Sequence, residues 1–426
     1  MSRTLGCSKA ALFELPGFLE RDRITEVGSF EDVPASVIDI PETIPQLGYA
    51  SHQFFRYYGK IPSILGREIV RHFGQRDCSV LDCYAGSGTT LVEAQMAGYE
   101  SYGIDINPLG VLACNVKTAY FDMGSLRAAF QDMIRAAAAP ALKPWRPTET
   151  KVSKLEKWFP PSAIEGLGRL RAALEKLPIC TEREFLAVCL LAIVRRASRA
   201  FDGEVRPHIN RSKNPRPPEV IIREKFADML RGLDELDDMR DASQSSTVIG
   251  DNRLASTYMG LTERAPGLVI AHPPYLNSFN YLHAFSLEFM WAEGLQEVWP
   301  PDWTLSRVQG LESRAWPATN PRVMHEYYED LRAMTKAAGS CLVPGGTLAL
   351  IIGDATIRGE LESVHKKSWK ILESAGLIPT AIWFRTTHYG IGKYAYSHRA
   401  DYHGEATKKD AVLFFTKPID RVDRQQ

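Results

Sequence analysis

Short apolar runs and segments of helical periodicity alternate along most of the chain. The runs have the length and composition of buried strands: SVLDCYAG, SYGIDI, STVIGD, LVIAHPP, GGTLALIIGD, PTAIWFRTT and DAVLFFTK. Two segments between them, TTLVEAQMAG and NPLGVLACNVKTAYF, repeat apolar residues at helical spacing. Alternation of this kind is typical of a parallel sheet. It predicts an α/β fold with a seven-stranded, mostly parallel sheet, its strands marked by Val80, Tyr102, Val248, Val269, Leu348, Ile382 and Val412.

A long stretch of helical character interrupts the alternation after the second strand. Residues 126–139, 153–177, 182–200 and 220–236 carry apolar residues at positions i, i+3 and i+4. The loop RPHINRSKNPRPPE separates the last two. We therefore expect residues 121–246 to be a helical insertion between the second and third core strands. Residues 1–50, rich in Pro, Gly and acidic residues, are expected to form an irregular N-terminal arm.

Composition excludes several classes of protein. The 426 residues, 45% of them hydrophobic, are enough for one large core or two ordinary ones. The 51 basic and 51 acidic side chains balance, so a polyanion must be held by a local patch. Seven cysteines without a CxxC pair argue against a disulfide framework and a zinc site and favour a reducing compartment. No segment reads as a signal peptide or a membrane span, so we expect a cytoplasmic protein with no membrane partner.

The first two core strands end in carboxylates. In VLDCYAGSGTTLVEA the strand ends at Asp82, and Gly86 and Gly88 permit a tight turn before a helix that begins near Thr89. Taken alone, this is also the pattern of an ordinary strand-to-helix turn. The next strand ends at Asp105, where a carboxylate can accept hydrogen bonds from ribose hydroxyls. The GxGxxG fingerprint is absent, which disfavours nicotinamide and flavin enzymes.

Two further strand ends carry polar or rigid residues. VIGDN places Asp251 on the same edge of the sheet, either as an acceptor for an adenine amino group or as a helix N-cap. In LVIAHPPYLN an apolar strand runs into two prolines, each of which lacks a backbone donor, so the chain must leave the sheet there. Ligands of open α/β sheets bind just beyond such strand ends.

Together these motifs resemble the S-adenosylmethionine-dependent methyltransferases that act on exocyclic amino groups of nucleic-acid bases. DCYAGSGTT is similar to their cofactor loop, and HPPY to their catalytic (D/N/S)PPY tetrapeptide. HQFFRYYGKIPSILGREIV resembles the upstream segment that closes over the methionine moiety. The insertion, with WFPPSAIEGLGRLRAALEKL, and the continuation PPYLNSFNYLHAFSLEFMWAEG look most like bacterial DNA methyltransferases with SPPY that modify cytosine N4.

The resemblance implies a Rossmann-like class I methyltransferase with S-adenosyl-L-methionine as cofactor and DNA as partner. Its cofactor residues here would be Tyr58, Asp82, Tyr84, Ala85, Gly86, Gly88, Thr89, Asp105, Ile106 and Asp251. Its catalytic residues would be His272, Pro273, Pro274 and Tyr275. We expect a cofactor-binding half at residues 51–120 and a catalytic half at 247–420, with the insertion as a candidate DNA-recognition region.

The tetrapeptide fits the chemistry that an amino group requires. The exocyclic nitrogen is a poor nucleophile because its lone pair is delocalised into the ring, and acceptors aimed at its N–H bonds localise that pair. Pro273 offers a carbonyl without a competing local N–H. In the family, the aromatic at the position of Tyr275 stacks on a base flipped out of the duplex.

His272 stands where the family has Asp, Asn or Ser. A neutral imidazole accepts one hydrogen bond, whereas an imidazolium only donates. Three interpretations remain open: a working acceptor or base, a binding-competent but weak or inactive enzyme, and a different substrate. The first, our hypothesis, predicts that methylation falls as the pH drops through the imidazole pKa between about 5.5 and 8.

The base and the nucleic acid are also open at this point. The flanking pattern favours cytosine N4, and adenine N6 is the nearest alternative. RNA amino-methylation and a pseudo-methyltransferase that binds without turnover are the others. Cytosine C5 chemistry needs a cysteine nucleophile, and no Pro-Cys dipeptide occurs. A restriction or defence system is the expected context.

Two basic regions are candidates for nucleic-acid contacts. Between Arg195 and Lys225 nine Lys or Arg face four acids, a local net charge of +5, and we expect phosphate contacts from Arg206, Arg211, Lys213 and Arg216. A solvated loop is the alternative. Loop 385–409 mixes basic and aromatic residues, among them Lys393, Tyr394 and Arg399. His388, His398 and His403 lack metal-ligand spacing, so no metal is expected.

Overall fold

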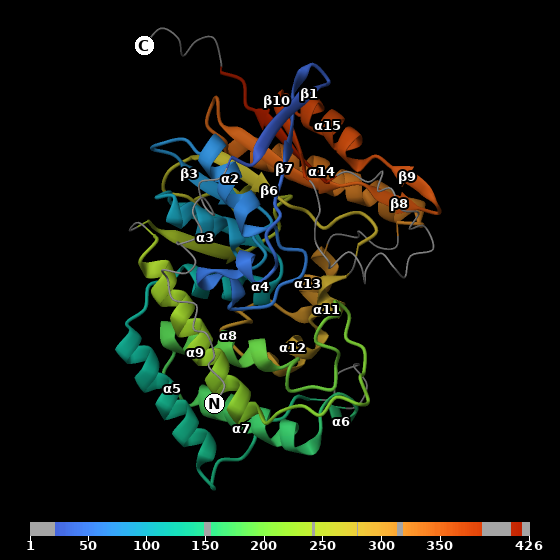
Figure 1. The fold of residues 1–426 in the computed structure, drawn as a ribbon. Coiled ribbons are helices and arrows are strands. Elements are labelled where there is room, and N and C mark those ends of the chain that lie inside the picture. Colours follow the sequence, from blue (N-terminus) through green and yellow to red (C-terminus); the bar gives the residue numbers. More distant parts are fainter. Residues whose placement is uncertain are drawn as a thin grey trace.

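A computed structural model describes residues 22–148, 155–240, 243–278, 280–312, 318–385 and 410–419 (Figure 1). Its main feature is a nine-stranded sheet in the order β1-β2-β10-β11-β7-β6-β3-β4-β5. The strands are β1 (Ile24–Phe30), β2 (Val33–Ile38), β3 (Ser79–Asp82), β4 (Ser101–Asp105), β5 (Ser245–Ile249), β6 (Pro266–Ala271), β7 (Thr347–Gly353), β10 (Ile378–Arg385) and β11 (Asp410–Thr416). A separate small hairpin pairs β8 (Ala355–Ile357) with β9 (Glu360–Glu362).

The sheet is mostly parallel, as the sequence predicts, but it has two strands more than expected. The seven predicted strands are β3 to β7, β10 and β11. β11 runs antiparallel to both of its neighbours, β7 and β10. From β3 the chain proceeds outward to β4 and β5 and then returns to β6 on the other side of β3. The strand order reverses between β3 and β6, and such a reversal leaves a crevice at the carboxyl ends of the strands.

The additional strands lie in the segment expected to be an irregular arm, and that expectation was wrong for its described part. β1 and β2 form an antiparallel hairpin, and β2 pairs in parallel with β10 at the end of the sheet. Five of the seven β1 residues are exposed, so the strand lacks the apolar alternation of a half-buried strand. Pairing with a distant strand, rather than a local pattern, determines its conformation.

Helices cover both faces of the sheet because successive strand residues point to opposite sides. Leu268 and Ile270 of β6 pack with α2 (Ser63–Phe73) in one cluster. Val269 and Ala271 pack with α14 (Pro321–Cys341) and α15 (Val364–Ser374) in another. α3 (Thr89–Met96) and α4 (Pro108–Thr118) follow β3 and β4. β6 and β7 are buried along their whole length, so the crevice lies at the end of strands in the core of the molecule.

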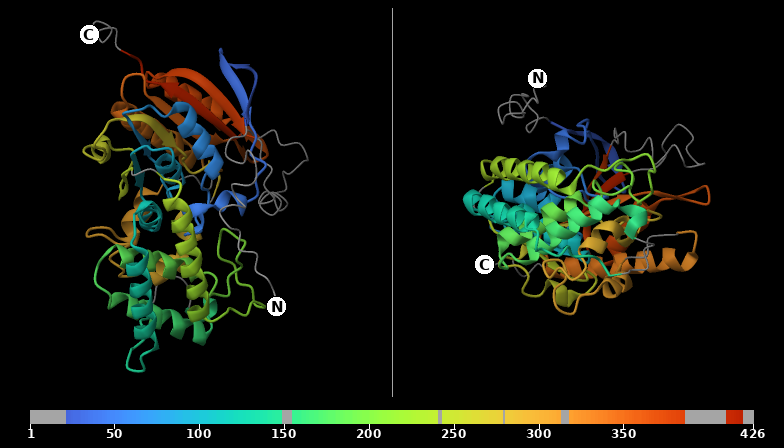
Figure 2. Two further views of the ribbon diagram at one scale, coloured as in Figure 1. Left: turned by 60° about the vertical axis from the view of Figure 1, so that its left-hand side comes forward. Right: turned by 90° about the horizontal axis from the view of Figure 1, so that it is seen from below.

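A helical layer lies between β4 and β5 in the chain and at one end of the sheet in space (Figures 1 and 2). The four segments of helical periodicity correspond to α5 (Met123–Ala138), α6 (Leu155–Trp158) with α7 (Pro161–Glu175), α8 (Thr181–Ile193), and α9 (Pro218–Asp237). Their core is mainly aliphatic and includes stacked aromatic rings, such as those of Phe130 and Phe226 at 3.9 Å. The buried Trp291 of α12 (Ser286–Trp291) joins the same cluster.

Helix α9 also packs on the segment that precedes α2, which contains η1 (Gln46–Gly48) and η2 (Ala50–Gln53). Gly232 permits this approach, because a Cβ there would lie 2.4 Å from the carbonyl oxygen of Ala50. Glu235 accepts a hydrogen bond from the Ala50 N–H at 2.9 Å, and Lys225 donates to the Gln53 carbonyl at 2.8 Å. The last helix of the insertion is therefore attached to residues at the start of the predicted cofactor-binding half.

The remaining helices lie after β5 and β6: α10 (Ala255–Tyr258), α11 (Tyr281–Ala284) and α13 (Leu305–Leu311). Among the described residues, no helix combines the length and apolar character that crossing a membrane requires.

Candidate active site

The glycine turn after β3 has the geometry that its sequence predicts. Gly86 and Gly88 have φ values of +52° and +78°, in the left-handed region that side chains disfavour. A Cβ at Gly88 would also lie 2.3 Å from the Sγ atom of Cys114. Gly88 precedes α3, so the turn directs the chain from the strand into the N-terminus of that helix.

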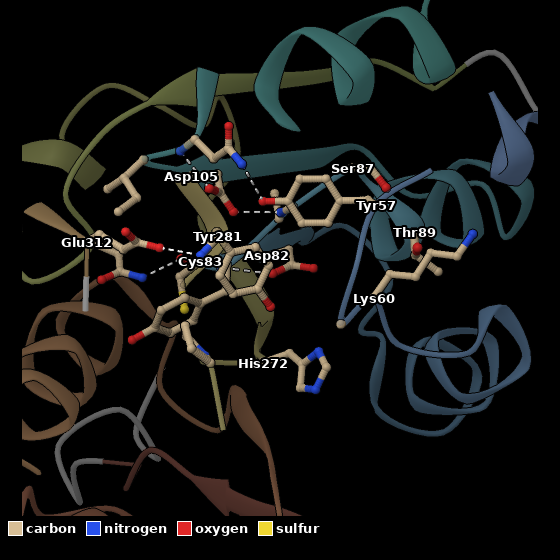
Figure 3. Close-up of a pocket in the computed structure, with 18 of the residues that line it drawn as sticks. Tyr57, Lys60, Asp82, Cys83, Ser87, Thr89, Asp105, His272, Tyr281 and Glu312 are labelled. Atoms are coloured by element: carbon tan, nitrogen blue, oxygen red, sulfur yellow. Dashed lines mark hydrogen bonds between the residues drawn. The ribbon is translucent and has the colours of Figure 1, made fainter. Parts of the chain in front are cut away.

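The ends of β3, β4 and β6 open into one cavity of about 890 Å³, part of it open to solvent (Figure 3). Asp82, Asp105 and His272 all line it, although they are far apart in the sequence. A volume of several hundred Å³ is typical of sites for small molecules and cofactors. The arrangement that the sequence predicts, two carboxylates and the HPPY segment on one side of the sheet, is therefore present.

The two carboxylates are fixed by main-chain donors. Asp105 accepts hydrogen bonds from the N–H groups of Gly86 at 2.7 Å and Asn107 at 2.8 Å. Asp82 accepts one from the N–H of Tyr84 at 2.9 Å. Burial raises the pKa of each carboxyl group to about 6. Both carboxylates thus hold a defined position while retaining lone pairs for a ligand.

Asp251 lines the cavity too, but its carboxylate is engaged by Arg253. The Arg253 guanidinium donates to both oxygens at 2.8 Å and also to Asp330 at 2.8 Å. Asp251 is not the N-cap of α10, a position taken by Leu254. Its carboxylate therefore serves first as the partner of a half-buried arginine at the cavity wall.

Only two of the four HPPY residues line the cavity. His272 and Pro274 line it, whereas Pro273 and Tyr275 do not. The His272 and Tyr275 rings meet edge to face at 5.3 Å. The Tyr275 ring lies on the end of β7, where a Cβ at Gly353 would approach it to 2.4 Å. Glycine at position 353 thus determines where this tyrosine can lie.

The imidazole of His272 is held in its neutral form. Burial lowers its pKa to about 3, and the positive charge of Arg385 acts in the same direction. Within the described part of the chain, its nitrogens have no hydrogen-bond partner. A pKa this low favours a neutral imidazole between about 5.5 and 8, so His272 is expected to add little pH dependence in that range.

Most of the other expected cofactor residues line the cavity, with two exceptions. Tyr84, Ala85, Gly86, Thr89 and Ile106 do so. Gly88 does not, because it packs against Cys114 behind the turn. Tyr58 points instead into the helical layer, where its hydroxyl donates to the carbonyl of Glu204 at 3.1 Å. Its neighbour Tyr57 lines the cavity and accepts a hydrogen bond from Asn107 at 3.1 Å.

Several residues of the cavity were not predicted from the sequence. Glu312 accepts hydrogen bonds from the Asn280 side chain at 2.7 Å and the Tyr281 N–H at 2.6 Å. Tyr281 stacks on Tyr57 at 5.8 Å. No short motif marks these contacts, although the polar Asn280 at the start of α11 is a helix N-cap signal. Lys60, Ser87 and Asn107 also line the cavity.

Several cations of the basic patch expected between residues 195 and 225 are engaged within the protein. Lys213 donates to Asp202 at 2.8 Å and to the Ala200 carbonyl at 2.8 Å. Arg216 forms a two-point ion pair with Glu224. Arg195 is buried against Glu288. Of the four predicted contacts, Arg206 is half-buried and Arg211 is exposed and has no ion pair within the described part. Two of the four residues predicted to contact phosphate, Lys213 and Arg216, are thus ion-paired, whereas the net positive charge of the region, which already counts Asp202 and Glu224, remains.

Loop residues Lys393, Tyr394 and Arg399 lie outside the described residues, as do His388, His398 and His403. Among the residues that are described, no group of three or more His, Cys, Asp or Glu side chains is arranged to hold a metal ion.

Comparison with known proteins points to one family. Residues 35–111 match the family model of DNA methylases. The matched segment contains the glycine turn, both buried carboxylates and the 57–61 wall of the cavity. It covers less than half of the chain.

Curated relatives carry related names. The chain is 38% identical over 84 residues to the type II methyltransferase M.MjaII of Methanocaldococcus jannaschii. The aligned segment covers 20% of this chain and 16% of that protein. It is 23% identical over 210 residues to the type II methyltransferase M.MvaI of Kocuria varians, covering 46% of each. The similar segments thus span less than half of either relative.

Solved structures with some likeness include TrmN from Thermus thermophilus, at 11% identity and a TM-score of 0.28, covering 84% of this chain and 49% of that one. The rRNA methyltransferase aviRa from Streptomyces viridochromogenes gives 10% identity and a TM-score of 0.32, covering 84% and 86%. At such scores neither likeness bears on function.

Proposed function

We propose that this chain is an S-adenosyl-L-methionine-dependent DNA methyltransferase that modifies an exocyclic amino group, cytosine N4 ahead of adenine N6. The observation that carries the proposal is the shared cavity, in which Asp82 and Asp105 face His272. The match of residues 35–111 to DNA methylases supports the cofactor half independently of the HPPY segment, which lies outside it.

The residues present fit the cofactor. Asp105, at the end of β4, is placed to accept from ribose hydroxyls, and Asp82 to accept from the ammonium group of a methionine moiety. The buried Oγ1 atom of Thr89 has no hydrogen-bond partner within the described part, which leaves a donor available at the cavity wall. S-adenosyl-L-methionine supplies a methyl group made electrophilic by a sulfonium sulfur.

The β6 end supplies what the acceptor amine needs. The neutral imidazole of His272 can accept from one N–H of the amino group, and the Pro273 carbonyl is a second acceptor by analogy with the family tetrapeptide. An acceptor that is fixed before the reaction draws the nitrogen lone pair toward the methyl donor without reorganisation, and His272, which lines the cavity, is the acceptor that we assign to this role.

Base flipping would bring the target to the His272 end of the cavity, and Tyr275, whose ring contacts His272 beside the cavity, is the proposed stacking surface. The helical insertion and the 385–409 loop are the proposed sources of DNA contacts. The type II names of the relatives suggest a restriction or defence system as the context and the cytoplasm as the location.

Transfer of tritiated methyl groups tests the proposal. The purified chain is incubated with duplex DNA, single-stranded DNA and tRNA, and labelled nucleosides are identified by mass spectrometry. We expect label in DNA as N4-methylcytosine. N6-methyladenine would reassign the base, and label confined to tRNA would reassign the substrate. Cofactor binding without transfer to any of the three would contradict the enzymatic proposal and favour a nucleic-acid-binding pseudo-methyltransferase.

A further inference from the structure

Lys117, near the end of α4, is a fully buried lysine without an acidic partner in the described part of the chain. Its side chain is 0% exposed, and its Nζ atom makes one hydrogen bond, to Ser87 Oγ at 2.9 Å. Buried lysines are normally paired with a carboxylate, because an isolated ammonium group loses its hydration without compensation. The position therefore lacks an expected anion.

Other lysines around this site add positive charge and supply no compensation. Lys60 lies at the cavity wall and donates to the His52 carbonyl at 3.0 Å. Lys225 reaches the Gln53 carbonyl from α9. Burial holds the pKa of Lys117 well below its ordinary value, and the charges of Lys60 and Lys225 lower it further. A ligand anion at this end of the cavity would relieve that repulsion.

Ser87 connects the buried lysine to the cavity. It lies between the two left-handed glycines, is 1% exposed, and lines the cavity. Since its oxygen accepts the hydrogen bond from Lys117, its own proton remains free to donate to a ligand. The unpartnered Thr89 hydroxyl and the N-terminus of α3 lie beside it. Figure 3 shows Ser87, Thr89 and Lys60 at one end of the cavity and Asp105 and Glu312 at the other.

We infer that this end binds the carboxylate of the ligand's amino-acid moiety, with Ser87 as the direct donor and Lys117 as a positioning residue that acts through Ser87. The assignment rests on the proposed function, since it takes S-adenosyl-L-methionine as the ligand. A ribose at Asp105 and an ammonium group at Asp82 leave the carboxylate at the Ser87 end. The carboxylate then supplies the negative charge that Lys117 lacks.

A pair of ligands that differ only in the carboxylate tests the inference. Isothermal titration measures the Kd of the full chain for S-adenosyl-L-homocysteine and for its decarboxylated analogue, S-adenosyl-3-thiopropylamine. We expect the unaltered protein to bind the carboxylate form about 10- to 100-fold more tightly, the range for one or two charge-assisted hydrogen bonds. Ser87→Ala and Lys117→Met should each bring this ratio toward one while leaving the Kd of the decarboxylated analogue unchanged.

Lys225→Met is the matched control, because it removes a nearby half-buried lysine on α9 that does not line the cavity. It should keep the full ratio. A ratio near one in the unaltered protein, or a full ratio in Ser87→Ala, would overturn the inference while leaving the proposed function intact. Absence of binding of S-adenosyl-L-homocysteine by the unaltered protein would overturn the proposed function and the inference with it. Ser87→Ala removes only one oxygen, so the test does not depend on Lys117→Met folding.

Discussion

The two ends of the cavity are constructed in different ways. At the cofactor end Asp82 and Asp105 are held by N–H groups of residues within two positions of the carboxylate or in the adjacent turn. At the base end His272 is positioned by ring contact with Tyr275, whose place depends in turn on Gly353 from another strand. The first end is determined mainly by local sequence, the second by packing between distant segments. Substitutions at the cofactor end should therefore change the Kd for the cofactor, and substitutions at the base end should change kcat or kcat/KM.

The largest effect is expected from His272→Ala. Removing a preorganised acceptor at the reacting nitrogen should lower kcat about 100- to 1,000-fold, with the Kd for S-adenosyl-L-homocysteine unchanged. His272→Ser, which restores a family tetrapeptide, is the control and should retain most of the activity. An alanine variant as active as the unaltered protein would remove His272 from the mechanism.

Asp82→Asn should act on the other end alone. The amide keeps an acceptor for the Tyr84 N–H but loses the charge that attracts an ammonium group. We expect the Kd for S-adenosyl-L-homocysteine to rise about 10- to 100-fold and kcat at saturating cofactor to change little. A fall in kcat with an unchanged Kd would show that Asp82 acts on the methyl-transfer step rather than on cofactor binding.

Acidification should also act through the cofactor end. Asp82 and Asp105 have pKa values of about 6, so they are ionised above that pH and become protonated below it. Cofactor affinity is expected to be constant above about pH 7 and to fall as the pH drops through 6 toward 5, by up to about tenfold per unit for each group. His272, with a pKa of about 3, should contribute nothing in this window. Titration calorimetry at pH 5 to 8 measures the profile, and Asp105→Asn should make it less steep.

Gly353→Ala should disturb only the base end. A Cβ at this position overlaps the Tyr275 ring, which must move and take the His272 contact with it. We expect kcat/KM for DNA to fall about tenfold, within the range of one misplaced catalytic group, without a change in cofactor Kd. Gly339→Ala is the matched control, since its Cβ would meet only Leu377 at 3.8 Å.

The smallest effects are expected on the insertion. Arg216→Ala removes a charge that Glu224 already neutralises, so the Kd for duplex DNA should be unchanged. Arg211→Ala removes an exposed charge and should raise that Kd about twofold to threefold, with a shallower salt dependence. Fluorescence anisotropy at several salt concentrations compares the two. Equal losses would indicate that the Arg216 ion pair opens on binding.

The sequence was sufficient where a residue's role follows from its near neighbours. Asp82, the two turn glycines and Asp105 could be located because strand ends and glycine turns have local signatures. Tyr57 and Tyr58 show the limit: both are buried aromatics, and only the packing of the helical layer decides which one faces the cavity. The β1–β2 hairpin was not predicted from the sequence for the same reason. Its strand β2 pairs with β10, which lies more than 300 positions away in the chain.

Charge raised a similar difficulty. Lys213 and Arg216 were expected to contact phosphate because the sequence does not reveal that Asp202 and Glu224 pair with them. Lys117 shows the reverse case, since it looks like an ordinary last-turn helix lysine and is in fact buried beneath the glycine turn.

The attachment of α9 to η2 links the helical layer thermodynamically to the cavity wall. Glu235 and Lys225 of α9 hold Ala50 and Gln53, only a few residues from Tyr57 and Lys60. A ligand that binds only when residues 57–61 are folded against the cavity stabilises that state by mass action. It therefore also stabilises any helix that unfolds together with these residues. Amide protons of α9 should therefore exchange more slowly with deuterium in the presence of cofactor, although no atom of that helix lines the cavity.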